Sequence, residues 1–187
     1  MDKETIEGIM GCLFILLLIC LGAFWVYDKI EQNRLKGALR DLEDVCRGVS
    51  HADYPAHNDN SRIHPVVGFL PNGAITFNYA PTEARVDSAE SVELVICVRE
   101  RREILIETCR YEKLNTIERY MEELDVVLYE IATGEVIASE TLVSTMPEAC
   151  KMIEEFPLGS TSMTKAYRSS IPDSQVREWV AKYAIRN

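Results

Sequence analysis

Positive charge is scarce in this sequence. Its 187 residues include 20 lysines and arginines against 30 aspartates and glutamates, which gives a formal net charge of −10. An acidic domain without a stripe of basic side chains repels the phosphate backbone of nucleic acids. We therefore expect no nucleic-acid partner.

The motifs that mark common catalytic and cofactor sites are absent. The sequence contains no Walker A, G-x-G-x-x-G, H-E-x-x-H, G-x-S-x-G or EF-hand pattern. Ser162 and Lys165 have the S-x-x-K spacing of penicillin-recognising enzymes, but no K-T-G or S-D-N accompanies them. Glu122, Glu123 and Asp125 are better explained as the solvent-exposed polar face of a strand than as an acid/base pair. We expect no catalytic activity and no cofactor.

Metal ligands are also few. The sequence has no C-x-x-C pair, which argues against a zinc finger-like site. Its three histidines, His51, His57 and His64, lie in one polar segment with Asp53 and Asp59. Imidazole and carboxylate groups can bind metals, but no pair here has the fixed spacing that a helix or hairpin would impose. We expect no metal.

One long hydrophobic run is present. Residues 8–27, GIMGCLFILLLICLGAFWVY, contain no charged residue. As a helix they would be about 30 Å long, which matches the hydrocarbon core of a bilayer. A cleaved signal peptide would have a basic start and a small-residue cleavage site, and this segment has neither. The run predicts a retained transmembrane helix in the lipid bilayer, with Trp25 and Tyr27 at the membrane interface.

Residues 28–48 are predicted to form an amphipathic stalk helix that ends at Gly48. The apolar positions of its stripe are Leu35, Ala38, Leu39, Leu42, Val45 and Cys46. The stripe has two interpretations: it docks a protein partner or a second copy of the chain, or it packs on its own domain. Residues 49–63, which are polar and rich in Asn and Asp, predict a linker.

Residues 64–187 are predicted to form a β-rich domain. Apolar runs of strand length alternate with turn signals, including Asn-Gly and Thr-Gly pairs. The predicted strands are 64–70, 74–79, 91–98, 103–111, 117–131 and 135–143. The charged sequence RERR at 99–102 reads as a turn, and the first half of 117–131 also fits a helix. Six or seven strands with short connections indicate an antiparallel β-sandwich-like domain.

The chain ends in a predicted amphipathic helix, residues 172–184. Pro172 and Asp173 stand where such a helix would start, and apolar residues recur after them at helical spacing. We expect this helix to close one side of the sheet, with Trp179 as its largest apolar side chain. The expected fold class is mainly β, with an N-terminal transmembrane helix and stalk and a C-terminal helix.

Four cysteines fall in the predicted soluble part: Cys46, Cys97, Cys109 and Cys150. A hairpin turning at RERR would direct Cys97 and Cys109 to opposite faces of the sheet, which disfavours a bond between these two. Each would then pair with Cys46 or Cys150, and the sequence leaves both connectivities open. Four unpaired thiols are the alternative.

Two features of the sequence disagree on which side of the membrane the β-rich domain lies. Cations follow the apolar run at Lys29, Arg34, Lys36 and Arg40, and the positive-inside tendency would place them in the cytoplasm. Long domains, however, translocate largely regardless of their flanks, and cysteines suited to disulfides indicate an oxidising compartment. We expect an extracytoplasmic domain on the cell membrane.

Several segments together resemble a known group of proteins. They are DVCRG, ADYPA, IHPVVGF, VELVICV, IETCRY, LDVVLYEIATGEVIAS, MPEAC and VREWV, which are spread over residues 40–183. In this pattern the chain is similar to an uncharacterised family of small bacterial single-pass membrane proteins with a four-cysteine, β-rich extracytoplasmic domain. The resemblance implies location and architecture, and it implies no chemistry.

These observations favour a membrane-anchored, extracytoplasmic binding or scaffolding module without catalytic activity. A sheet edge or the loop of residues 144–170 is the expected contact surface, because long loops on rigid sheets commonly carry recognition. The first alternative is a cytoplasm-facing regulatory or accessory subunit of a membrane complex, docked by the stalk helix. An extracytoplasmic hydrolase ranks third.

Overall fold

The computed structural model describes residues 20, 22, 25–26, 29–57 and 62–186. The chain divides into two compact units, Met1–Arg40 and Asp41–Asn187. The predicted transmembrane segment 8–27 lies mostly outside the described residues, Tyr27 included, whereas Trp25 is described and exposed. Within the part of the chain that the structure describes, no helix is long and apolar enough to cross a membrane.

The predicted stalk is helical where it is described. Residues 29–39 are α-helical, and the helix continues as the 3₁₀ helix η1 (Arg40–Arg47). Gly48 ends η1 in the left-handed conformation, with φ +83°, which glycine adopts without strain. Leu42 and Val45 of η1 are fully buried. This end of the apolar stripe therefore packs within the second unit.

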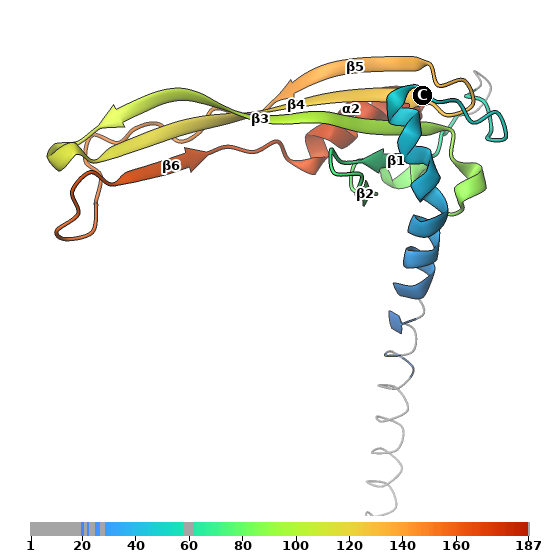
Figure 1. Ribbon diagram of the computed structural model, residues 1–187, viewed down its shortest axis with the longest axis horizontal. Coiled ribbons are helices and arrows are strands. Elements are labelled where there is room, and N and C mark those ends of the chain that lie inside the picture. The colour runs from blue at the N-terminus through green and yellow to red at the C-terminus, as the bar shows by residue number, and fades with distance from the viewer. Residues whose placement is uncertain (1–19, 21, 23–24, 27–28, 58–61, 187) are drawn as a thin grey trace, which may run out of the picture. The chain divides into compact units, whose positions relative to one another are not determined.

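Six strands form one sheet (Figure 1). The strands are β1 (Val66–Phe69), β2 (Ile75–Thr76), β3 (Leu94–Arg110), β4 (Thr116–Glu130), β5 (Val136–Val143) and β6 (Thr164–Arg168). Their order is β2-β1-β3-β4-β5, and β6 also pairs with β4. The mainly β prediction and the number of strands are confirmed. The predicted antiparallel sandwich is wrong, because the described strands make a single sheet. In this sheet β1 and β3 are a parallel pair, and so are β4 and β6.

The predicted turn at RERR is wrong, because β3 runs through it as one strand of 17 residues. The arginines stay in the strand because the acidic residues of β4 lie opposite them. Arg101 forms an ion pair with Glu122 at 3.0 Å, and Arg102 reaches Glu123 at 3.2 Å. The segment 117–131 is strand along nearly its whole length, as β4 shows.

The apolar core lies at one end of the long β3–β4 pair. Helix α2 (Asp173–Ala184) confirms the predicted terminal helix and buries Trp179 to 2% exposure. The core also takes side chains from β1, the first part of β3 and the second part of β4. Short 3₁₀ helices connect the strands: η2 (Thr82–Ala84), η3 (Ala89–Ser91) and η4 (Glu112–Leu114).

The other end of the β3–β4 pair extends away from this core (Figure 1). From Arg99 onward β3 is mostly exposed, and β5 pairs only with the second half of β4. The first half of β4 pairs with β6 instead. We call this end the tip: residues 107–119 of the hairpin and the loop 144–163, which a disulfide joins to β3.

Candidate functional site

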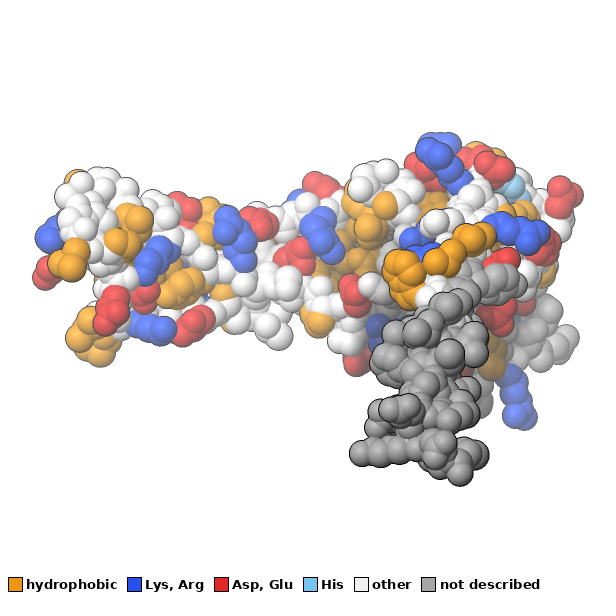
Figure 2. Space-filling view, turned by 90° about the horizontal axis from the view of Figure 1, so that it is seen from below, with side chains coloured by type: hydrophobic (Ala, Val, Ile, Leu, Met, Phe, Trp, Pro, Cys, Tyr) orange, Lys and Arg blue, Asp and Glu red, His pale blue; other side chains and the backbone are white. Residues whose placement is uncertain are grey.

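Large apolar side chains face solvent at the tip. Leu114 is 80% exposed and Ile153 84%, and Met152 and Leu158 are wholly exposed. We call these four residues the apolar patch, and Figure 2 shows hydrophobic side chains among charged ones at this end of the second unit. Burying such a side chain is worth about 1.5–3 kcal/mol. Several such side chains left in water at one end of a domain are typical of interaction surfaces.

A pocket of about 390 Å³ opens beside the apolar patch. The rings of Tyr111 and Phe156 line it with centroids 5.5 Å apart, and Pro157 adds a third rigid apolar wall. Asn115 is among its polar lining residues. The charged residues Glu112, Lys113 and Glu154 also line it, so the concavity combines aromatic and polar walls. Such a mixture suits the anchoring side chain of a partner.

The loop 144–163 is fastened to the strands through its backbone. Arg119, only 8% exposed, donates from Nε to the carbonyl of Glu148 and from Nη2 to that of Pro147, both at 2.8 Å. The hydroxyl of Tyr111 donates to the carbonyl of Lys151 at 2.8 Å. These bonds turn three carbonyls of the loop toward the strands, while Met152, Ile153 and Leu158 face solvent.

Lys165 of β6 fastens the second part of the loop. Its ammonium donates to Glu154 Oε1 at 2.9 Å and to the carbonyl of Glu155, and it lies 4.6 Å from the centre of the Phe156 ring. The hydrogen bond from Lys165 holds the pKa of the Glu154 carboxyl below its usual value. Lys165 therefore has a structural role, and no hydrogen bond joins it to Ser162, whose N–H donates to the carbonyl of Lys113.

The turn between β3 and β4 has an unusual composition. The carbonyl of Glu112 accepts from the N–H of Asn115, and both central residues, Lys113 and Leu114, have positive φ, at 56° and 61°. A type I′ turn requires positive φ at both positions and strongly prefers Asn-Gly there. A lysine and a leucine in this conformation are strained, each by roughly 1–2 kcal/mol.

The four cysteines form two disulfides. Cys46 bonds Cys97 with a Cα–Cα distance of 5.6 Å, and Cys109 bonds Cys150 with a distance of 6.2 Å. This is one of the two connectivities that the sequence left open. The turn at RERR that was expected to separate Cys97 from Cys109 does not exist. The two residues are separated because both lie on β3, about 40 Å apart at 3.3 Å per residue.

Of the three carboxylates proposed as a solvent-exposed strand face, Glu122 does not fit. Its side chain is buried at 8% exposure. It accepts the N–H of Ile171 at 2.6 Å and pairs with Arg101. Glu122 thus fastens the segment before α2 to β4, while Glu123 and Asp125 remain partly exposed.

The three histidines lie at the core end of the sheet. His51 bonds Asp44 through Nε2 at 2.8 Å, and the fully buried His64 bonds Glu93 through Nδ1 at 2.6 Å. The rings of His57 and His64 pack against each other, with centroids 4.1 Å apart and planes tilted by 45°. Asp53 is exposed, and Asp59 lies outside the described residues. Among the residues described, these side chains form no cluster of metal-ligand geometry.

The contact between His57 and His64 predicts acid sensitivity. Burial lowers the pKa of His57, the His64 imidazole lowers it further, and the carboxylates of Glu130 and Glu93 oppose both effects only in part. The unfolded chain, with a histidine pKa of about 6.5, then binds more protons than the folded one in acid, so stability falls as the pH drops through that value. We expect the urea midpoint to fall between pH 7.5 and 5.5, and to fall less in His57→Gln. An equal fall in both proteins would contradict this.

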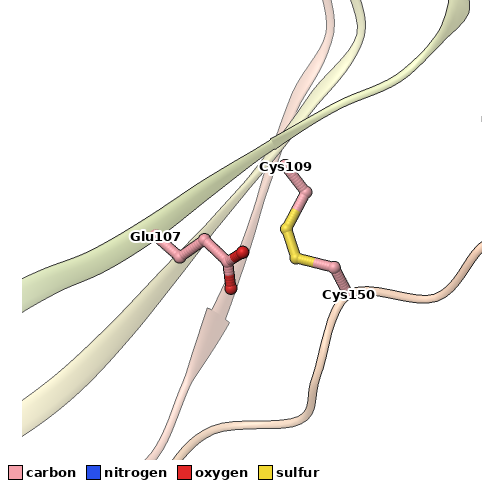
Figure 3. A group of neighbouring side chains, drawn as sticks. All are labelled: Glu107, Cys109 and Cys150. Atoms are coloured by element: carbon pink, nitrogen blue, oxygen red, sulfur yellow. A yellow bond between two sulfur atoms is a disulfide. The ribbon is translucent and has the colours of Figure 1, made fainter.

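The described residues do contain one group with metal-ligand spacing, at the tip. Ligand atoms of Glu107, Cys109 and Cys150 lie within 4.8 Å of one another (Figure 3). The two sulfurs are bonded to each other, and the Glu107 carboxylate pairs with Arg119. In this state the sulfur atoms are not thiolates and do not act as metal ligands.

Part of the tip could have been found from the sequence. The loop 144–170 was predicted as a contact surface, and its apolar residues beside Gly and Pro are the signal. Leu114 was missed, although a Lys-Leu pair at the end of a hairpin, where Asn-Gly is usual, is a recognisable departure. Comparison with protein-family models, with curated proteins and with solved structures finds no match for this chain.

Proposed function

We propose that this chain is a membrane-anchored binding module whose tip contacts a protein partner. Residues 8–27 would hold it in the bilayer, with Trp25 and Tyr27 at the interface. The resemblance to bacterial single-pass proteins and the four cysteines favour an extracytoplasmic domain. The proposal requires no cofactor and no catalytic step.

The observation that carries the proposal is the placement of Leu114. A leucine that is 80% exposed has its side chain in water, and its φ of 61° is a conformation that branched, bulky residues avoid. Both features lower the stability of the isolated chain, and neither serves the fold. Strained residues persist where function uses them, and this one stands at the apex of a hairpin beside a pocket.

A protein suits the tip better than a lipid surface does. The chain carries a net charge of −10, so an anionic bilayer would repel it. Around the apolar patch the charges come in both signs, and two pairs of them form ion pairs, Lys165 with Glu154 and Lys151 with Glu148. An apolar centre with a mixed polar rim is the usual composition of a protein–protein interface.

Photo-crosslinking in cells tests the proposal. A photoreactive benzoylphenylalanine at Leu158, in the apolar patch, should give a discrete crosslinked product that depends on Met152 and Ile153. The same group at Glu140, an exposed position on β5 away from the tip, is the matched control. Products of equal yield at both positions, or a product unaffected by Met152→Asp and Ile153→Asp, would contradict the proposal.

Replacing the two strained turn residues should raise stability and weaken binding. We expect Lys113→Asn with Leu114→Gly to raise the free energy of unfolding by about 1–2 kcal/mol. Asn-Gly adopts the type I′ turn with little strain, and the greater conformational entropy that glycine loses on folding offsets part of this gain. The same change removes one apolar side chain from the patch and should reduce the crosslink at Leu158 several-fold. Urea denaturation measures the first effect. A less stable variant would show that the Lys-Leu pair serves the fold instead.

A further inference from the structure

We propose that the tip disulfide is one of two states of a single site: once it is reduced, the thiolates of Cys109 and Cys150 and the carboxylate of Glu107 bind Zn²⁺. The three residues already offer ligand atoms within 4.8 Å of one another (Figure 3). Glu107 and Cys109 are two apart on β3 and therefore point to the same face of the strand. The inference goes beyond the proposed function and holds whatever the tip binds.

The chemistry balances with a dithiol as the reductant. Two electrons and two protons pass to the Cys109–Cys150 bond, which opens to two thiols, and the dithiol is oxidised to its own disulfide. Zn²⁺ then displaces both thiol protons, which leave for solvent. Thiolate and carboxylate are ligands that Zn²⁺ accepts, and three protein ligands with one water complete its tetrahedral coordination.

Arg119 would stabilise the metal-bound state in two ways. Two thiolates, one carboxylate and Zn²⁺ sum to one negative charge, and the guanidinium that already contacts Glu107 supplies the compensating positive charge. Arg119 also holds the carbonyls of Pro147 and Glu148, just before Cys150. These bonds do not depend on the S–S bond, so Cys150 stays beside Cys109 after reduction.

The second disulfide does not offer the same site. Cys97 is 2% exposed, so a reductant reaches it less readily than the partly exposed Cys109 and Cys150. Within the described chain, no His, Asp or Glu completes a three-ligand group with Cys46 and Cys97. Mild reduction should therefore open the tip bridge first. Zn²⁺ would then keep the loop 144–163 attached to β3 in a reducing environment.

The test titrates the full-length chain in detergent with Zn²⁺, and with Co²⁺ as a spectroscopic probe, before and after mild anaerobic reduction. Alkylation and mass spectrometry establish which thiols are free. We expect one equivalent of Zn²⁺ to bind only after Cys109 and Cys150 are released, and Co²⁺ to show thiolate charge-transfer absorption. Reduced chain with both thiols free and no metal bound would overturn the proposal.

Variants assign the ligands. Cys109→Ser should abolish tight binding, whereas Cys12→Ala with Cys20→Ala should leave it unchanged. Loss of a partner that only orients a ligand weakens metal sites about 10- to 100-fold, so Glu107→Gln should weaken binding at least that much. Glu103→Gln is the matched control, since it lies on the same strand and pairs with Arg168 instead. Equal effects of the two glutamine variants would overturn the role of Glu107.

Discussion

Replacing Cys46 and Cys97 together by alanine should lower the free energy of unfolding by about 4 kcal/mol under oxidising conditions. The bridge spans 51 residues, and closing a loop of that length removes about 4 kcal/mol of conformational entropy from the unfolded chain. The bond joins η1 to the buried part of β3, so no local opening can release it without exposing core side chains. Denaturation in guanidinium, followed by far-ultraviolet circular dichroism, measures the loss.

The tip disulfide supplies a matched comparison. Cys109 and Cys150 are 41 residues apart, so the entropy model alone gives a similar value of about 4 kcal/mol. The tip lies away from the core, however, and can open while the core stays folded. We expect Cys109→Ala with Cys150→Ala to lower global stability by less than about 2 kcal/mol. Equal losses in the two double variants would show that the tip and the core unfold as one unit.

Local patterns predicted the elements well where each residue's environment depends on its neighbours in sequence. The terminal helix shows its apolar face at helical spacing, and the strands around Thr133-Gly134 alternate on either side of a turn. The turn predicted at RERR is excluded only by the pairing of this segment with another strand. The acidic residues that keep Arg101 and Arg102 in the strand come from β4, some twenty positions later, and local propensity does not include them.

Strand β6 was not predicted, and this omission contributed to the incorrect prediction of a sandwich. β6 has only five residues, none fully buried, and its pairing with β4 is parallel. A short polar strand without a hairpin partner carries no periodic signal. With β6 missed and β3 divided at RERR, the remaining runs resembled a series of antiparallel hairpins, for which a sandwich is the natural arrangement.

The sequence predicted which segment forms the candidate site, but not how that segment lies against the strands. Gly and Pro around residues 144–170 mark a long loop, and long loops carry recognition. That the loop lies beside the hairpin apex depends on Arg119 and the Cys109–Cys150 bond, which join positions at least 28 residues apart. The segments that carry Leu114 and Leu158 are far apart in sequence, and these links bring the loop to the hairpin.

Trp179→Ala should be the most damaging single substitution at the other end of the molecule. Trp179 is 2% exposed on α2, within the main core cluster, and removing a buried aromatic side chain costs about 3–5 kcal/mol through lost transfer energy and the cavity left behind. Thermal and guanidinium unfolding, followed by circular dichroism, measure the loss. Trp25→Ala, which removes the only other tryptophan from an exposed position, should change the unfolding of this unit by less than about 0.5 kcal/mol.

Trp179→Phe distinguishes packing from hydrogen bonding. The indole Nε1 is buried and has no hydrogen-bond partner among the described residues. Phenylalanine therefore gives up part of the volume but no polar contact seen there, and it removes an unsatisfied donor. We therefore expect it to recover at least half of the stability lost in Trp179→Ala, and to leave the crosslink at Leu158 unchanged because the tip lies outside this core. A phenylalanine variant as unstable as the alanine variant would mean that the indole N–H is needed. A phenylalanine variant that loses the crosslink while folded would mean that the core and the tip are coupled.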